Sequence, residues 1–189
     1  MKDGDVFYRL KGIVDALLRA SSVADVRYAA KTDDSAFHPG RCAEVSAGGR
    51  VIGVLGEVHP DVAENYGFMY RTAAAELDFD ALAELYSTDF VYSPLPRYPA
   101  LERDFSFVCG EELEVGSVED EIRSASNAVE SVKLFDVYRG PQVGEGRKSV
   151  SFEVKLRSGD HTLNDEEADR AVKKILKALG AKFGIELRK

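Results

Sequence analysis

One stretch of the chain combines an aromatic ring with polar side chains at the spacing of a strand. It reads Leu-Phe-Asp-Val-Tyr-Arg-Gly from Leu134 to Gly140, and a glycine-rich stretch, Gly144–Ser149, follows it. Together they predict a strand, a turn and a second strand, with Tyr138 facing away from the core. Such a face suits single-stranded RNA, because a ring stacks on a base and polar groups bond to base edges. The alternative is an ordinary hairpin with one solvent-facing tyrosine, since exposed tyrosines are common.

The other candidate residues do not assemble into a catalytic or metal site. The segment His38–Arg41, His-Pro-Gly-Arg, could bind phosphate or serve acid–base chemistry, but its proline and glycine also predict a rigid turn. No two histidines have metal-ligand spacing. The segment Gly53–Gly56 fits neither a dinucleotide fingerprint nor a phosphate loop, and no nucleophile elbow or Cys–His pair is present. We therefore expect no catalytic residue and no metal site in this chain.

The composition is that of a globular protein with one or two domains. The 189 residues are 44% hydrophobic and 31% charged, with a net charge of -8. No apolar run is long enough to cross a bilayer, and the N-terminus lacks the features of a signal peptide. Cys42 and Cys109 are expected to be buried free thiols, which fits a reducing cytoplasm. The acidic balance argues against a general polyanion binder, but residues 94–189 are nearer to neutral and could contact RNA locally.

Prolines between residues 93 and 99 predict a boundary between two domains, residues 1–92 and 93–189. The first half predicts an amphipathic helix with apolar positions at residues 10, 13, 14, 17 and 18, strands near residues 25–30, 42–46, 51–58 and 73–78, and short helices at 60–66 and after Asp80. The segment Ala47–Arg50 predicts a hairpin turn. These elements leave a sheet face in need of cover, so we expect an incomplete domain and a piece of a longer protein.

The second half predicts the order βαββαβ, a ferredoxin-like arrangement with both helices on one sheet face. The strands are expected near 104–109, 132–139, 148–157 and 185–188. One helix is expected from Ser117 to Ala125. The other is expected to open at Asn164, with Glu167 completing its capping box, and to break at Gly180 and Gly184. By alternation, Phe135 and Val137 face the core, while Leu134 breaks the alternation and indicates either a bulge or a partly covered rim. The opposite side, which we call the open face, then carries Ser106, Asp136, Tyr138, Ser149 and Ser151.

Six stretches in collinear order carry a resemblance to a known family. They are Gly53–Pro60, Ala75–Asp78, Pro96–Asp104, Leu134–Gly140, Glu145–Ser149 and Thr162–Glu167. In this order the chain resembles the bacterial phenylalanyl-tRNA synthetase β subunit over nearly its whole length. The subunits of that family are several times longer, so the resemblance implies a C-terminal fragment.

The resemblance implies a fold of class α+β with two domains. Residues 1–92 correspond to the C-terminal part of a catalytic-like but non-catalytic class II synthetase core, a partial antiparallel α/β domain. Residues 93–189 correspond to a ferredoxin-like βαββαβ anticodon-binding domain. The segment His38–Arg41 falls in a motif of the first domain, and no catalysis is assigned to it.

The resemblance also implies partners and site residues. In the family, the open face meets the anticodon of phenylalanine tRNA. The matching positions are Tyr138 for base stacking and Ser106, Asp136 and Ser149 for polar contacts. The other partner implied is the α subunit of an (αβ)2 heterotetramer, which uses ATP and Mg²⁺ to aminoacylate tRNA in the cytoplasm. Those cofactor sites fall outside this chain, which is expected to be catalytically inactive alone.

A function of a different class remains open from the residues themselves. A stand-alone ferredoxin-like regulatory or protein-interaction module would use the same open face to bind a ligand or to dimerise. The two hypotheses differ in the effect of Tyr138→Ala, which would weaken RNA binding only if the ring stacks on a base.

Overall fold

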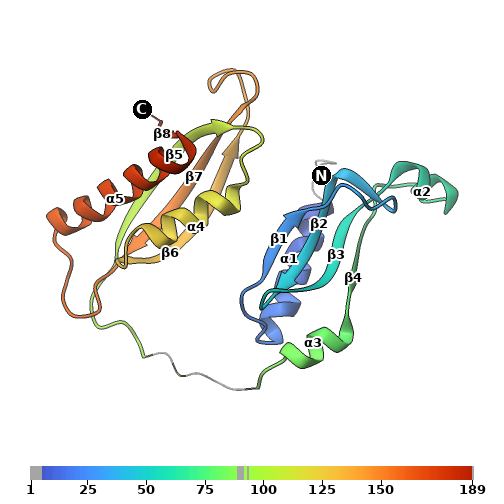
Figure 1. Ribbon diagram of the computed structural model, residues 1–189, viewed down its shortest axis with the longest axis horizontal. Helices are drawn as coiled ribbons and strands as arrows, with labels where there is room; N and C mark the ends of the chain where they lie inside the picture. Colours follow the sequence, from blue (N-terminus) through green and yellow to red (C-terminus); the bar gives the residue numbers. More distant parts are fainter. Residues whose placement is uncertain (1–5, 89–91, 93, 189) are drawn as a thin grey trace. The chain divides into compact units, whose positions relative to one another are not determined.

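The computed structural model describes residues 6–88, 92 and 94–188, which form helices and antiparallel sheets of an α+β protein (Figure 1). The chain divides into two compact units, residues 1–92 (unit 1) and residues 93–189 (unit 2). Each unit has its own four-stranded sheet and its own hydrophobic core.

Unit 1 is a sheet with a helix packed against it. Its elements are α1 (Val6–Ala20), β1 (Arg27–Ala30), β2 (Phe37–Ala47), β3 (Arg50–Val58), α2 (Pro60–Asn65), β4 (Ala73–Leu77) and α3 (Phe79–Leu85). The strands pair antiparallel in the order β1-β2-β3-β4. The expected hairpin turn joins β2 to β3, where Gly48 and Gly49 have φ angles of 58° and 78°, a region that favours glycine.

The core of unit 1 uses only part of the apolar stripe on α1. Val14 and Leu18 are buried against Val45 and neighbouring sheet residues. Ile13 and Leu17, which belong to the same expected stripe, are 67% and 47% exposed. The apolar surface of α1 is therefore wider than the sheet of this unit covers.

Unit 2 has the expected order βαββαβ. Its elements are β5 (Leu101–Gly110), α4 (Val115–Ala125), β6 (Val129–Tyr138), β7 (Arg147–Leu156), α5 (Asp165–Phe183) and β8 (Glu186–Leu187). The sheet order is β6-β7-β5-β8, and every pair is antiparallel. Figure 1 shows α4 and α5 on the same side of this sheet, so its other side carries no helix of this unit.

The buried side of the unit 2 sheet is filled by alternate residues of its strands. Phe105, Phe107, Val150, Phe152 and Val154 are each at most 5% exposed, and they pack with Ile122 of α4 and Ile175 of α5. This alternation is the one that the sequence predicts for β5 and β7.

The ends of the helices agree only partly with the expectations. The capping box of α5 is present, with Asn164 accepting from the Glu167 amide at 2.9 Å. Gly180 does not break this helix; α5 runs on to Phe183, where Gly184 ends it in the left-handed conformation. Ser117 does not cap α4, which starts two residues earlier and has no side-chain cap. Similarly, α3 is capped by Asp78 rather than by Asp80.

The orientation expected for Phe135 is wrong, and a bulge is the reason. Leu134 lies opposite Phe152, and Asp136 lies opposite Ser151, so two steps along β6 match one step along β7. Phe135 is the extra residue. Its side chain is 54% exposed, whereas Leu134 packs against the core. Of the two alternatives at Leu134, the structure has the bulge, and it carries Phe135 to the solvent instead of the interior.

Candidate nucleic-acid interface

The open face of unit 2 brings the expected site residues together in two rows across three strands. The first row is Asp136 on β6, Ser151 on β7 and Ser106 on β5, which are cross-strand partners. The hydroxyl oxygens of Ser106 and Ser151 are 2.8 Å apart and share a hydrogen bond. Asp136 is exposed, so its carboxylate can accept hydrogen bonds from a ligand.

The second row contains Tyr138 on β6, opposite Ser149 on β7. The ring of Tyr138 is partly exposed and lies outside the hydrophobic core. Its phenol end lies against Gly140, where an added Cβ would stand 2.3 Å from the Tyr138 Oη atom. A residue with a side chain at position 140 would therefore displace this ring.

Arg188 follows β8, which forms the edge of the sheet opposite to β6, and its side chain contacts the same ring. Its guanidinium carbon lies 5.7 Å from the centre of the Tyr138 ring, within the range of a cation–π contact. Its Nη2 atom donates to Gln142 Oε1 at 2.9 Å, and its backbone amide donates to the Ser106 carbonyl. The sequence gives little sign of this residue, because the contact joins positions fifty residues apart.

Ser149 differs from the other expected contact residues in its burial. It is 1% exposed, and its Oγ atom has no hydrogen-bond partner among the residues that the structure describes. A buried hydroxyl without a partner costs free energy. In this conformation Ser149 is not accessible to a ligand, whereas Ser106, Asp136 and Tyr138 are at least partly exposed.

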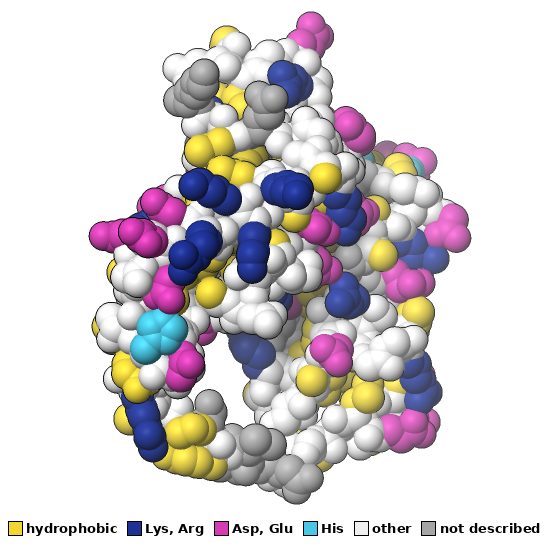
Figure 2. All heavy atoms as spheres, turned by 60° about the vertical axis from the view of Figure 1, so that its left-hand side comes forward, with side chains coloured by type: hydrophobic (Ala, Val, Ile, Leu, Met, Phe, Trp, Pro, Cys, Tyr) yellow, Lys and Arg dark blue, Asp and Glu magenta, His cyan; other side chains and the backbone are white. Residues whose placement is uncertain are grey.

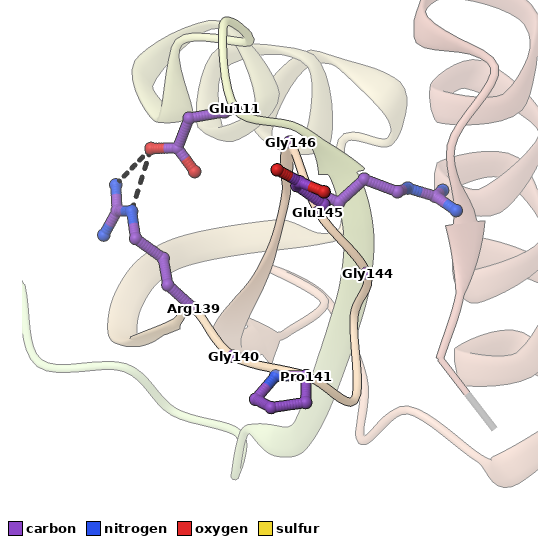
Figure 3. Close-up of a pocket in the computed structure, with 8 residues that line it drawn as sticks. Glu111, Arg139, Gly140, Pro141, Gly144, Glu145 and Gly146 are labelled. Carbon is purple, nitrogen blue, oxygen red and sulfur yellow. Dashed lines mark hydrogen bonds and ion pairs between the residues drawn. The ribbon is translucent and has the colours of Figure 1, made fainter.

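A shallow pocket of about 400 Å³ lies beside the open face, in the connection between β6 and β7 (Figure 3). It is lined by Glu111, Arg139, Gly140, Pro141, Gly144, Glu145, Gly146 and Arg147. Arg139 and Glu111 form an ion pair across it at 2.8 Å, and Arg139 holds the pKa of the Glu111 carboxyl below its usual value. Arg139 already has an acidic partner, so the pocket offers less positive charge than its residues suggest.

The segment His38–Arg41 of unit 1 contributes Arg41 to an ion pair with the buried carboxylate of Glu57. These residues are looped out of the β2–β3 pairing, because Phe37 faces Val58 while Cys42 already faces Gly56. Arg41 reaches Glu57 at 3.3 Å, and Arg71 bonds both oxygens of the same carboxylate. Arg71 holds the pKa of Glu57 below its usual value, against the opposing effect of burial. The expected rigid turn is wrong, because residues 38–41 lie within β2 as an irregularity in its pairing, and the ion pair gives Arg41 a structural role.

The described residues contain neither a candidate metal site nor a membrane-spanning helix. Within residues 6–88, 92 and 94–188, no group of three or more His, Cys, Asp or Glu could hold a metal ion. None of the helices in these ranges is long and apolar enough to cross a membrane. Cys42 and Cys109 are buried free thiols, and burial raises the pKa of each.

Comparison with known proteins agrees with the fold. A family model for the ferredoxin-fold anticodon binding domain matches residues 96–188. Unit 2, with its βαββαβ order and helix-free sheet face, is a domain of that class. A second family model, for the phenylalanyl tRNA synthetase beta chain CLM domain, matches residues 2–79. With both domains in this order, the chain belongs to the phenylalanyl-tRNA synthetase β-chain family.

Individual relatives give the same result. The chain is 39% identical over 183 residues to the phenylalanine–tRNA ligase beta subunit of Clostridium acetobutylicum, covering 96% of this chain and 23% of the relative. It is 42% identical over 181 residues to that of Symbiobacterium thermophilum, covering 94% of this chain and 20% of the relative. The chain therefore spans less than a quarter of the length of these two relatives.

Proposed function

We propose that unit 2 binds the anticodon region of phenylalanine tRNA, as the C-terminal part of a phenylalanine–tRNA ligase β subunit. The observation that supports this most is the open face itself. The described part of unit 2 places no helix on it, and it carries a partly exposed ring, an exposed carboxylate and the partly exposed hydroxyl of Ser106, which is hydrogen-bonded to the buried Ser151. These are the groups that recognise unpaired bases. The family to which the chain belongs does not favour the alternative of a stand-alone interaction module.

Each residue has a role that follows from its position. Tyr138 stacks on a base, and Asp136 and Ser106 bond to base edges beside it. Ser149 can join them only if its surroundings rearrange, because its hydroxyl is buried in this conformation. The net charge of -8 predicts weak binding by the isolated chain, since phosphate contacts supply much of the affinity for nucleic acid.

Unit 1 has the surface of a domain that packs against another protein. Its exposed apolar side chains include Tyr8, Ile13 and Leu17 on α1, together with Met69 and Tyr70, which are 87% and 82% exposed. On the chain as a whole, Figure 2 shows hydrophobic side chains at the surface between charges of both signs. We assign part of this apolar surface to the α subunit of an (αβ)2 heterotetramer. That cytoplasmic assembly carries out ATP-dependent aminoacylation, with ATP and Mg²⁺ bound outside this chain.

The proposal is tested by titrating the 189-residue chain at low salt with a hairpin RNA that carries the phenylalanine anticodon loop. A hairpin with a scrambled loop is the RNA control. We expect tighter binding of the first hairpin, and we expect Tyr138→Ala to weaken it by about 1–3 kcal/mol. Tyr66→Ala removes a ring that is 76% exposed in unit 1 and should leave binding unchanged. Equal affinity for the two hairpins would overturn the proposal.

A second measurement tests whether this chain catalyses aminoacylation by itself. The chain mixed with ATP, phenylalanine and tRNA should form no aminoacyl-tRNA above background. Aminoacylation by this chain alone would contradict the assignment of catalysis to another part of the assembly.

A further inference from the structure

We propose that Phe135 is a second base-stacking position on the open face, so that the sheet of unit 2 holds two unpaired bases of one RNA strand. The inference rests on the proposed function and extends it to the number of bases that this site takes.

The bulge in β6 places Phe135 on the same side of the sheet as Asp136. Lys133 and Phe135 are both exposed, whereas Leu134 between them packs against the core, so both point away from the side that Leu134 occupies. Asp136 lies opposite Ser151 and also points to the open face. The bulge thus gives two consecutive residues to one face, an exposed ring followed by an exposed carboxylate.

The exposure of Phe135 has no structural explanation within unit 2. The ring is 54% exposed and is absent from both the core and the partly buried residues packed against it. A phenylalanine in solvent forgoes the free energy that its burial would provide. An apolar ring held at the surface beside Asp136 and Tyr138 is suited to covering the flat face of a ligand.

The spacing of the two rings indicates separate bases. Phe135 and Tyr138 are three residues apart on the edge strand β6. The bulge fits two residues of β6 into one step of β7, so at about 3.3 Å per step their backbone positions are roughly 8 Å apart along the strand. Stacked neighbours in a nucleic acid strand are only about 3.4 Å apart. The two rings therefore fit bases that have been splayed apart, with the Asp136 carboxylate between them to accept hydrogen bonds from a base edge.

The test places the fluorescent base 2-aminopurine at one position at a time in the loop of the anticodon hairpin. Stacking on an aromatic side chain changes the fluorescence of that base. With the unaltered 189-residue chain at low salt, we expect changes at two loop positions. Phe135→Ala should abolish the change at one of them and Tyr138→Ala at the other. Each variant should weaken binding by about 5- to 150-fold.

Three further variants separate stacking from other effects. Phe135→Tyr keeps the ring and should retain both fluorescence changes, whereas Phe135→Leu keeps only the apolar bulk and should behave like Phe135→Ala. Phe79→Ala removes a ring that is 79% exposed in unit 1 and should have no effect. Since Phe135 lies outside the core, these variants are expected to fold.

The outcomes distinguish this inference from the proposed function. If Tyr138→Ala weakens binding while Phe135→Ala leaves affinity and fluorescence unchanged, the second stacking position is refuted and the function stands. If Phe135→Leu matches the unaltered chain, the contact is apolar rather than stacking, and the inference is again refuted. If the unaltered chain binds neither hairpin, the proposed function fails, and this inference fails with it.

Discussion

Replacing Glu57 with glutamine should destabilise unit 1 without affecting unit 2. The Glu57 side chain is 7% exposed and shares its carboxylate between Arg41 and Arg71. Glutamine has nearly the same shape but no charge. The substitution therefore removes the electrostatic partner of two guanidinium groups while leaving the packing of β3 almost intact.

The magnitude follows from the exposure of the three groups. Breaking a fully buried ion pair by removing one partner costs about 3–5 kcal/mol, and an exposed pair contributes about 0–1 kcal/mol. Here the carboxylate is buried, but the side chains of Arg41 and Arg71 are 44% and 34% exposed and can be rehydrated. We therefore expect an intermediate loss of about 2 kcal/mol in the free energy of unfolding of unit 1.

Because the two units can unfold separately, the assay needs a probe confined to unit 1. Hydrogen–deuterium exchange of peptides from β2 and β3 provides it, and 2 kcal/mol corresponds to about 30-fold faster exchange. Peptides from β7 serve as an internal control and should not change. Glu84→Gln is the matched variant, since Glu84 pairs with Arg50 at 2.5 Å but is 68% exposed. Glu84→Gln should lower the free energy of unfolding of unit 1 by less than about 1 kcal/mol.

The dependence on pH gives a second check. The pKa of Glu57 is lower in the folded chain than its ordinary value of 4.5. The carboxylate therefore contributes its full stabilisation above about pH 4.5, and the contribution is lost as the pH falls through the lowered pKa. The difference in the free energy of unfolding of unit 1 between the unaltered chain and Glu57→Gln should become smaller below that pH. Equal costs for Glu57→Gln and Glu84→Gln, or no difference in exchange at neutral pH, would refute the reasoning.

Three further substitutions in unit 2 have defined outcomes. Gly140→Ala places a Cβ atom 2.3 Å from Tyr138 Oη, so it should displace the ring and weaken RNA binding; added to Tyr138→Ala, it should have no further effect in the same titration. Ser149→Ala removes a buried hydroxyl without a described partner. It should therefore raise the free energy of unfolding by up to about 1 kcal/mol, measured by thermal unfolding. Weaker RNA binding by this variant would indicate that the hydroxyl bonds to the ligand. Asn164→Ala removes the cap that accepts from the Glu167 amide and should cost about 1 kcal/mol, measured as faster exchange of the first turn of α5; unchanged exchange would contradict the role of the cap.

Local patterns in the sequence predict most of unit 2. Val150, Phe152 and Val154 alternate with polar residues, and each lies in the core as expected. The capping box of α5 is also visible in the sequence, because Asn164 and Glu167 interact within a single turn. These features depend on neighbours along the chain, which the sequence contains directly.

The features that the sequence does not predict depend on distant partners. In the sequence Phe135 continues an alternation with Val137, and only its register against β7 identifies it as the extra residue of a bulge. Ser149 has an outward position on its strand, yet it is buried next to Tyr138 on the neighbouring strand. Ile13 and Leu17 belong to a regular apolar stripe, but the sheet of unit 1 covers only part of it. In each case the sequence does not show which distant part of the chain packs against the residue.

Because Phe135 is the extra residue of the bulge in β6, it could be removed without changing the orientation of the other side chains of that strand. Leu134 lies opposite Phe152 and Asp136 opposite Ser151, so removing the residue between them would leave regular pairing from Ser131 to Tyr138. Every other side chain of β6 would stay on its present side, whereas a deletion elsewhere in a strand turns over all the residues beyond it. A lineage could therefore gain or lose this aromatic group through the insertion or deletion of a single codon, without repacking the interior.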